Sequence, residues 1–75
     1  MDKVENLLAM AKRNPEGLSF RDFDALLVGC GFRFDRQSGS HRIYVAPKGQ
    51  RLSIQNRNGM AKRYQVRQAI KMIEE

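Results

Sequence analysis

Apolar residues near the start of the chain recur at the spacing of an amphipathic helix. Asp2 can cap this helix, with Glu5 at the capping-box position, and Pro15 stops it after about Arg13. The apolar stripe consists of Val4, Leu7, Leu8 and Ala11. Because this stripe is too apolar to be left in water, we expect the helix to pack on its own domain or, as the alternative, on a second copy of the chain.

Two further helices are predicted by the same periodicity. The first begins after Ser19, which is placed as its N-cap with Asp22 at the capping-box position, and Gly31 suits the left-handed position just past its end. Its apolar stripe is Phe20, Phe23, Leu26, Leu27 and Cys30. The last helix is expected from about Lys62 to Glu74, with a buried stripe of Val66, Ala69, Ile70 and Ile73.

Three short strands lie between these helices, and turn residues predict their register. A two-residue turn at Ser38-Gly39 pairs Gln37 with Ser40, Arg36 with His41, Asp35 with Arg42, Phe34 with Ile43 and Phe32 with Val45. A four-residue turn at Pro47–Gln50 pairs Val45 with Leu52, Ile43 with Ile54 and His41 with Asn56. Residues 56–59 are expected to form a loop into the last helix.

These elements predict an α+β domain of two layers, in which the helices cover the single apolar face of a three-stranded antiparallel sheet. The opposite, open face should then carry Arg33, Asp35, Arg42, Tyr44, Arg51, Ser53 and Gln55. Seventy-five residues are enough for one such domain, with residues 1–15 as an additional N-terminal helix.

The composition excludes several classes of protein. No run of about 18 apolar residues is present, so a transmembrane helix is not expected, and the mixed charges of the N-terminus argue against a secretory signal. The single cysteine, Cys30, cannot form an internal disulfide and fits a reducing, cytoplasmic setting. One Cys and one His cannot make a tetrahedral zinc site, and no nucleotide-binding loop is present, so we expect no metal and no cofactor.

The positive charge of the chain is concentrated in its middle. The net charge is +6, yet residues 33–67 hold nine Lys or Arg against the single acid Asp35, which is a net charge of +8. A basic block between nearly neutral ends suggests a surface that binds a polyanion, with RNA or DNA as the first candidate. The alternative is an Arg-rich surface that provides solubility and has no ligand.

His41 is the one side chain whose ordinary pKa lies near neutrality. The predicted register puts it at the end of the sheet beside Arg36 and Asn56, close to the start of the last helix with Lys62 and Arg63. A histidine beside a phosphate site could take the proton of a ribose 2′-OH while cations stabilise the phosphorane. The alternative is a half-buried structural histidine.

Three other side chains have a chemical and a structural interpretation. Tyr44 on the open face could stack a base, or could be a packed cross-strand side chain. Tyr64 is interpreted as a packing anchor rather than a stacking platform, and Cys30 as an inert core residue rather than a nucleophile.

Residues 18–74 resemble the HicA family of toxin–antitoxin systems. The resemblance is carried by Gly31-Phe32, by Gly39-Ser40-His41 with Ile43-Tyr44 after it, and by the order of the third strand and closing helix. It implies a fold like that of double-stranded-RNA-binding domains (αβββα). Two features depart from the family pattern: the helix over residues 2–13, and residues 55–66 in place of a Gly-Thr-Leu entry to the last helix.

The resemblance also implies an activity, a partner and a site. HicA proteins are mRNA interferases that cleave RNA without a metal, and a HicB antitoxin neutralises them. His41 would be the catalytic residue, and the candidate RNA- or phosphate-binding residues are Arg36, Ser40, Asn56, Lys62 and Arg63. Two other functions remain open: a non-catalytic RNA-binding module of the same fold, and a basic protein-interaction domain.

Overall fold

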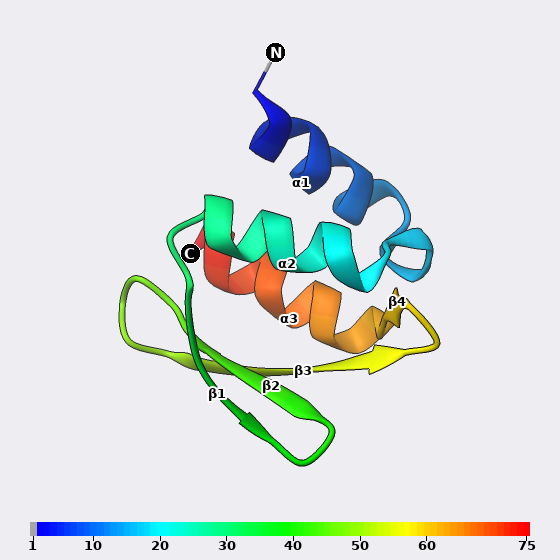
Figure 1. The fold of residues 1–75 in the computed structure, drawn as a ribbon. Coiled ribbons are helices and arrows are strands. Elements are labelled where there is room, and N and C mark those ends of the chain that lie inside the picture. Colours follow the sequence, from blue (N-terminus) through cyan, green and yellow to red (C-terminus); the bar gives the residue numbers. More distant parts are fainter. Residues whose placement is uncertain (1) are drawn as a thin grey trace.

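The computed structural model describes residues 2–75, which form three α-helices, a short 3-10 helix and one antiparallel sheet (Figure 1). The helices are α1 (Lys3–Arg13), η1 (Pro15–Gly17), α2 (Phe20–Gly29) and α3 (Arg63–Glu74). The strands are β1 (Arg33–Ser38), β2 (His41–Val45), β3 (Arg51–Arg57) and β4 (Met60–Ala61), and they lie in the order β1-β2-β3-β4. The predicted α+β class is confirmed, with a fourth, two-residue strand added at one edge.

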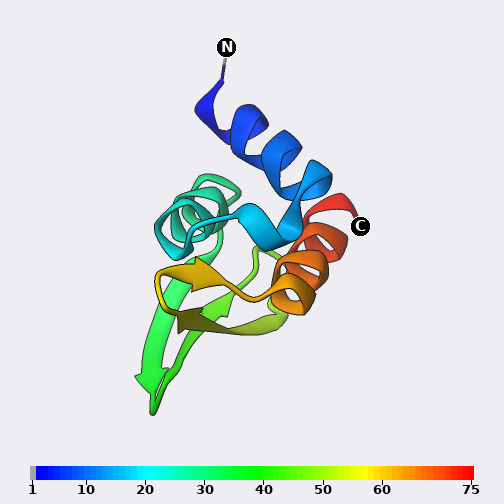
Figure 2. The ribbon, with the colours of Figure 1, turned by 90° about the vertical axis from the view of Figure 1, so that its right-hand side faces the viewer.

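The molecule has the sheet on one side and the helices on the other. α2 and α3 cover one face of the sheet, and α1 lies across both of them on the side away from the sheet (Figures 1 and 2). The β1–β2 hairpin projects beyond the helices (Figure 2). Its tip therefore lacks helical cover on either face.

The first helix packs on its own domain, as predicted. Asp2 caps it by accepting a hydrogen bond from the Val4 backbone N–H (3.1 Å). Leu7 and Ala11 are buried in the core, and Val4 and Leu8 pack against it. The approach to α2 is close, because a Cβ placed on Gly29 would come within 2.4 Å of Val4 Cγ2.

The predicted N-cap of α2 and the predicted apolar stripes of α2 and α3 are also confirmed. Ser19 Oγ accepts a hydrogen bond from the Asp22 backbone N–H (3.0 Å), and Gly31 has the expected left-handed conformation, with a φ of 90°. The buried residues of α2 are Phe23, Leu26 and Leu27, and those of α3 are Gln65, Val66 and Ala69. Ile70 and Ile73 pack partly buried against the same core.

The predicted register of the first hairpin is wrong. The turn consists of Gly39 and Ser40 rather than Ser38 and Gly39, so Ser38 pairs with His41. Gly39 has a φ of 60° and precedes a residue with negative φ, which is the pattern of a type II′ turn with glycine at its first central position. A bulge between Phe34 and Arg36 then shifts the register again, so that Phe34 pairs with Tyr44.

The second hairpin is also displaced by one residue from the prediction. Its loop is Pro47–Gly49, closed by hydrogen bonds from Gly49 N to Ala46 O (2.8 Å) and from Ala46 N to Gln50 O (2.7 Å). Gly49 is left-handed, with a φ of 94°, as in a type I turn followed by a glycine bulge. Tyr44 consequently pairs with Leu52, and Ile43 with Ser53.

These shifts exchange the two faces of β2. Tyr44 is fully buried beneath the helices with Leu52 and Ile54, whereas Ile43 and Val45 lie half-buried on the open face. Phe34 was expected in the core but is 47% exposed on the projecting hairpin. The predicted open-face positions of Tyr44 and Arg42 are therefore wrong, while those of Arg33, Arg51, Ser53 and Gln55 agree with the observed register.

Residues 56–59 form a second kind of turn instead of the predicted loop. β3 continues to Arg57, and Asn58-Gly59 turn the chain back into β4 with positive φ at both residues (53° and 85°). This is the pattern of a type I′ turn, for which Asn-Gly is the preferred sequence. Asn56 Oδ1 accepts a hydrogen bond from the Gly59 backbone N–H (2.7 Å) and closes the turn.

Candidate functional site

His41 is the first residue of β2 and lies on the open face at one end of the sheet. Its cross-strand partners are Ser38 and Gln55, so the prediction that it faces Arg36 and Asn56 is wrong. The residue is half-buried, and its face of the sheet is not covered by a helix (Figure 2). His41 is thus placed where a ligand on the open face can reach it.

The neighbours of His41 are polar and are connected to α3. Gln55 Nε2 donates to Ser40 Oγ (3.4 Å), which brings the candidate residue Ser40 to the same end of the sheet. The Gln55 backbone N–H donates to Oε1 of the buried Gln65 (2.8 Å). Gln65 therefore fixes the start of α3 to the strand beside His41. This role was missed at the sequence level, because a polar residue on a helix gives no signal of burial.

Lys62 and Arg63 lie at the start of α3, as predicted. Lys62 is the N-cap residue of the helix, without a side-chain cap, and Arg63 Nη1 donates to Glu16 Oε1 (3.1 Å). Both residues line an open hollow of about 670 Å³, together with Glu16, Arg57, Asn58, Met60, Ala61 and Tyr64. We call this hollow the β4–α3 groove. Asn56, another candidate phosphate-binding residue, lies in the adjoining turn, where its Oδ1 accepts the hydrogen bond from Gly59 N.

A second hollow adjoins the first one and involves the extra N-terminal helix. Its volume is about 420 Å³, and Glu16 and Arg63 line it as well. The remaining lining residues are Lys12, Arg13, Asn14, Pro15, Arg67 and Ile70. We call it the α1–α3 groove. The two grooves together contain six Lys or Arg and one acid, so they form a continuous basic surface.

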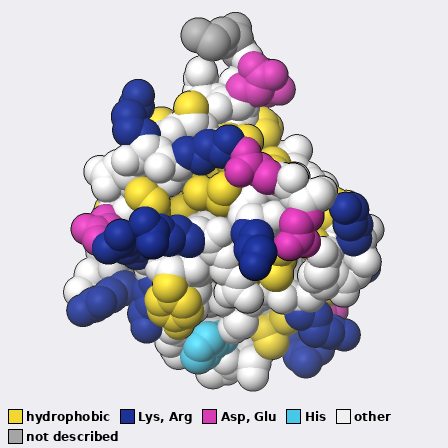
Figure 3. All heavy atoms as spheres, turned by 180° about the vertical axis from the view of Figure 1, so that it is seen from behind, with side chains coloured by type: hydrophobic (Ala, Val, Ile, Leu, Met, Phe, Trp, Pro, Cys, Tyr) yellow, Lys and Arg dark blue, Asp and Glu magenta, His cyan; other side chains and the backbone are white. Residues whose placement is uncertain are grey.

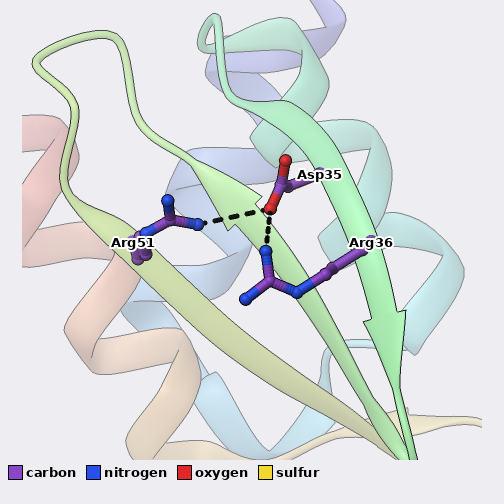
Figure 4. A network of polar contacts seen from close by, with 3 residues as sticks. All are labelled: Asp35, Arg36 and Arg51. Atoms are coloured by element: carbon purple, nitrogen blue, oxygen red, sulfur yellow. Dashed lines mark hydrogen bonds and ion pairs between the residues drawn. The ribbon is translucent and has the colours of Figure 1, made fainter.

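Arg36 is not directed to His41. Its Nη1 donates to Asp35 Oδ2 (2.8 Å), which also accepts from Arg51 Nη1 (3.2 Å) (Figure 4). The predicted pairing of Asp35 with Arg42 is wrong, because the observed register pairs Arg42 with Gln37 and leaves Asp35 unpaired in the bulge. Arg51 begins β3, four residues before Gln55, so this ion-pair network holds Arg36 toward the opposite end of the strand from His41.

Tyr44 cannot act as a stacking platform, since its side chain is fully buried. Its hydroxyl donates to Asp24 Oδ1 on α2 and accepts from Arg42 Nε (3.1 Å). Burial, followed by the hydrogen bond to Asp24, raises the pKa of Tyr44 above 10. The Arg42 guanidinium in turn lies 4.3 Å from the centre of the Phe34 ring.

Tyr64 also differs from the prediction. It is 62% exposed and lines the β4–α3 groove, so it is not a packing anchor. Figure 3 shows the face on which α3 lies, where Lys and Arg side chains (dark blue) surround exposed hydrophobic ones and the single histidine (cyan) is at the surface. His41 is therefore exposed on the same side of the molecule as α3, whose first residue, Arg63, lines both grooves.

Cys30 is partly buried, and this burial raises the pKa of its thiol, with a smaller contribution from the negative charge of Asp2. A raised thiol pKa disfavours the nucleophilic thiolate, in line with the structural role expected for it. Within residues 2–75, no group of three or more His, Cys, Asp or Glu lies together in a way that could hold a metal ion. None of the helices in this part of the chain is long and apolar enough to cross a membrane.

The fold and the surface define a small basic α+β domain in which helices cover one face of an antiparallel sheet, like the double-stranded-RNA-binding domains. The family described as HicA toxin of bacterial toxin–antitoxin systems matches residues 20–74, which is most of the chain. The protein belongs to this HicA toxin family. No curated protein and no solved structure matches the chain. The matched residues include Gly39-Ser40-His41 and exclude α1.

Proposed function

We propose that this protein is a metal-independent RNA endonuclease in which His41 transfers the proton during cleavage. The observation that supports this most is the position of His41, which is half-exposed at the uncovered end of the sheet inside the matched family region. The two basic grooves provide positive charge for the RNA backbone.

The proposed reaction is an internal transesterification of RNA. His41 accepts the proton of a ribose 2′-OH, and O2′ attacks the adjacent phosphorus while the bond from phosphorus to O5′ breaks. The products are a 2′,3′-cyclic phosphate and a 5′-hydroxyl, whose proton comes from water or from the imidazolium. Ser40 beside His41 and Lys62 at the N-cap of α3 are the candidate donors to the phosphate oxygens.

A HicB-like antitoxin is the proposed protein partner, since the family is one half of a toxin–antitoxin system. Such a partner would neutralise the toxin by covering the open sheet face or the basic grooves. A HicB-like reading frame adjacent to the gene would support this proposal, and co-purification of the two products would test it directly.

The test of the proposed function is the His41→Ala variant in an RNA cleavage assay. We expect cleavage to fall by about 10²- to 10⁴-fold, because this is the usual contribution of a positioned general base or acid. Folding should be normal, as His41 lies outside the hydrophobic core. RNA binding should persist, because the cations of the grooves are unchanged, and EDTA should leave the wild-type rate unchanged.

The outcomes separate the proposed function from its alternatives. Undiminished cleavage by a folded His41→Ala variant would exclude His41 as the catalytic residue. If the wild type binds RNA and does not cleave it, the protein is a non-catalytic RNA-binding module. If RNA binding is absent even at low salt, where phosphate contacts are strongest, a basic protein-interaction domain is the better description.

A further inference from the structure

The β4–α3 groove combines an exposed aromatic ring with unpaired positive charge. Tyr64 is the most exposed of the large hydrophobic side chains in residues 2–75, at 62%, and Met60 beside it is 37% exposed. Exposed aromatic and apolar side chains in a groove are costly in water and typically mark a binding surface. Bases stack on such rings in proteins that bind single-stranded nucleic acid.

The cations of the groove are available for a ligand. Within residues 2–75, Arg57 and Lys62 form no ion pair, and only Arg63 is held, by Glu16. Arg57 ends β3 and Lys62 is the N-cap residue of α3, and both line the same groove as Tyr64. A phosphate in the groove would therefore meet the positive charge of both residues.

The groove is also fixed relative to His41. Gln65 Nε2 donates to the Tyr64 hydroxyl (3.2 Å), and Gln65 Oε1 accepts from the backbone N–H of Gln55, the cross-strand partner of His41. Tyr64 and His41 are therefore connected through two side chains and one strand. The strand that carries Gln55 also ends at Arg57 of the groove, so β3 joins the groove to the end of the sheet where His41 lies.

We propose that the β4–α3 groove is a subsite for single-stranded RNA, in which Tyr64 stacks an unpaired base and Arg57 and Lys62 bind the neighbouring phosphates. This inference rests on the proposed function for the nature of the ligand. Tyr64 should make the protein bind single-stranded RNA more tightly than duplex RNA, because the bases of a duplex are already stacked on each other.

The test compares Tyr64→Ala with Tyr64→Phe in binding of a short 2′-O-methyl RNA, which cannot be cleaved through its 2′-oxygen. We expect Tyr64→Ala to weaken binding of the single strand by about 5- to 100-fold and to leave binding of the matching duplex unchanged. Tyr64→Phe retains the ring and should bind as the wild type does. Melting curves of both variants show whether the fold is intact.

Charge variants give a second, independent measurement. Arg57→Gln and Lys62→Gln should each lower the slope of log Kd against log salt by about 0.7 for the single strand, as each removes one phosphate contact. Lys71→Gln is the matched control, because Lys71 is exposed in the last turn of the same helix. It should leave both the slope and the affinity unchanged.

Several results would overturn the subsite. Unchanged single-strand affinity of Tyr64→Ala would leave the groove to another partner, such as the antitoxin protein. If Tyr64→Ala and Tyr64→Phe lose the same single-strand affinity, the hydroxyl and its hydrogen bond to Gln65 matter rather than the ring. If Tyr64→Ala loses as much affinity for the duplex as for the single strand, base stacking is excluded. If Tyr64→Ala does not fold, Tyr64→Trp replaces it, because the sequence has no other tryptophan. Binding of single-stranded RNA must then quench the fluorescence of this tryptophan, and an unchanged fluorescence would contradict the subsite.

Failure of the subsite can be told from failure of the proposed function. Binding of the uncleavable RNA does not depend on His41 chemistry. A protein that cleaves RNA through His41 and ignores Tyr64→Ala contradicts the subsite alone. A protein that needs Tyr64 to bind the single strand and cleaves nothing contradicts the proposed nuclease alone.

Discussion

The hydroxyl of Tyr44 allows a polar atom to lie within the covered face of the sheet. This hydroxyl forms hydrogen bonds with Asp24 of α2 and with Arg42 of its own strand. The ring can therefore pack with Leu52 and Ile54 without leaving a buried polar group unpaired. Alternation of apolar residues cannot reveal this arrangement. In β2, Ile43 and Val45 are the more apolar set, and the prediction therefore placed them in the core, whereas Tyr44 occupies it.

This buried hydroxyl makes stability depend on pH in the alkaline range. The pKa of Tyr44 is raised above 10 in the folded protein, so its stabilising contribution is complete below pH 10 and is lost as the pH rises through the folded-state pKa. We expect the wild type to lose unfolding free energy above pH 10 more steeply than Tyr44→Phe does. Urea unfolding at a series of pH values measures both curves.

At neutral pH the comparison has a second expected result. Tyr44→Phe leaves Asp24 and Arg42 without their shared partner, which should lower the unfolding free energy by about 1–2 kcal/mol. The difference in unfolding free energy between the wild type and Tyr44→Phe should therefore become smaller as the pH rises above 10. A gap that stays constant from neutral to alkaline pH would contradict the raised pKa.

At the scale of elements, the helices could be predicted and the strand register could not. Ser19 and Asp2 cap helices at the predicted places, and Gly31 ends α2, because these signals are local. The register depends on which residue takes the left-handed position in each turn. Gly39 is the first rather than the second residue of its turn, and the second loop ends at Gly49 rather than at Gln50. The bulge near Asp35 adds a further shift. The Asn58-Gly59 signal for a hairpin was present in the sequence and was interpreted as a loop.

The contact of α1 with α2 depends on the absence of a side chain at Gly29. A Cβ there would come within 2.4 Å of Val4 Cγ2, and a valine methyl group in a helix has little freedom to move. We expect Gly29→Ala to lower the unfolding free energy by about 1–2 kcal/mol, although alanine is the better helix former. Thermal or urea unfolding measures the change.

The control for this prediction is a second substitution on the facing helix. Val4→Ala removes the methyl groups that the new Cβ would meet, so Gly29→Ala should cost little in the Val4→Ala background. A cost that is the same in both backgrounds would mean that α1 does not press on Gly29. The double-mutant cycle thus isolates the contact between the two helices.

At the scale of the whole molecule, the fold gathers charge that the sequence separates. The charge distribution of the sequence alone predicts that Arg36, Lys62 and Arg63 contribute more to RNA affinity than Lys3, Lys12 and Arg13. In the structure, Lys12 and Arg13 also line the α1–α3 groove, together with Arg63 and Arg67. Arg36 is held in an ion pair with Asp35. Lys12 and Arg13 can line this groove only because α1 packs beside α3, and no local pattern in the sequence specifies that arrangement.

For the candidate site, the sequence predicted the position of His41 in the sheet but did not predict its neighbours. His41 was identified from its chemistry and from the resemblance of Gly39-Ser40-His41 to a family motif, and its place at the end of the sheet agrees with the structure. Its true neighbours, Gln55 and through it Gln65, depend on the register and on a long-range hydrogen bond. Tyr64 was assigned to packing because exposure of an aromatic residue cannot be deduced from helical periodicity alone.

The position of Arg13 leads to a prediction that separates a built groove from a diffuse positive field. Arg13→Gln removes a cation that lines the α1–α3 groove, whereas Lys3→Gln removes one from the opposite end of the same helix. If the groove binds the phosphate backbone, Arg13→Gln should weaken RNA binding and lower the salt slope by about 0.7–0.9, and Lys3→Gln should change neither. Glu16→Gln should have the opposite effect and tighten binding, because Glu16 is the acid shared by both grooves and holds Arg63. Filter binding at several salt concentrations measures all three variants, and equal losses for Arg13→Gln and Lys3→Gln would show that only the overall charge attracts RNA.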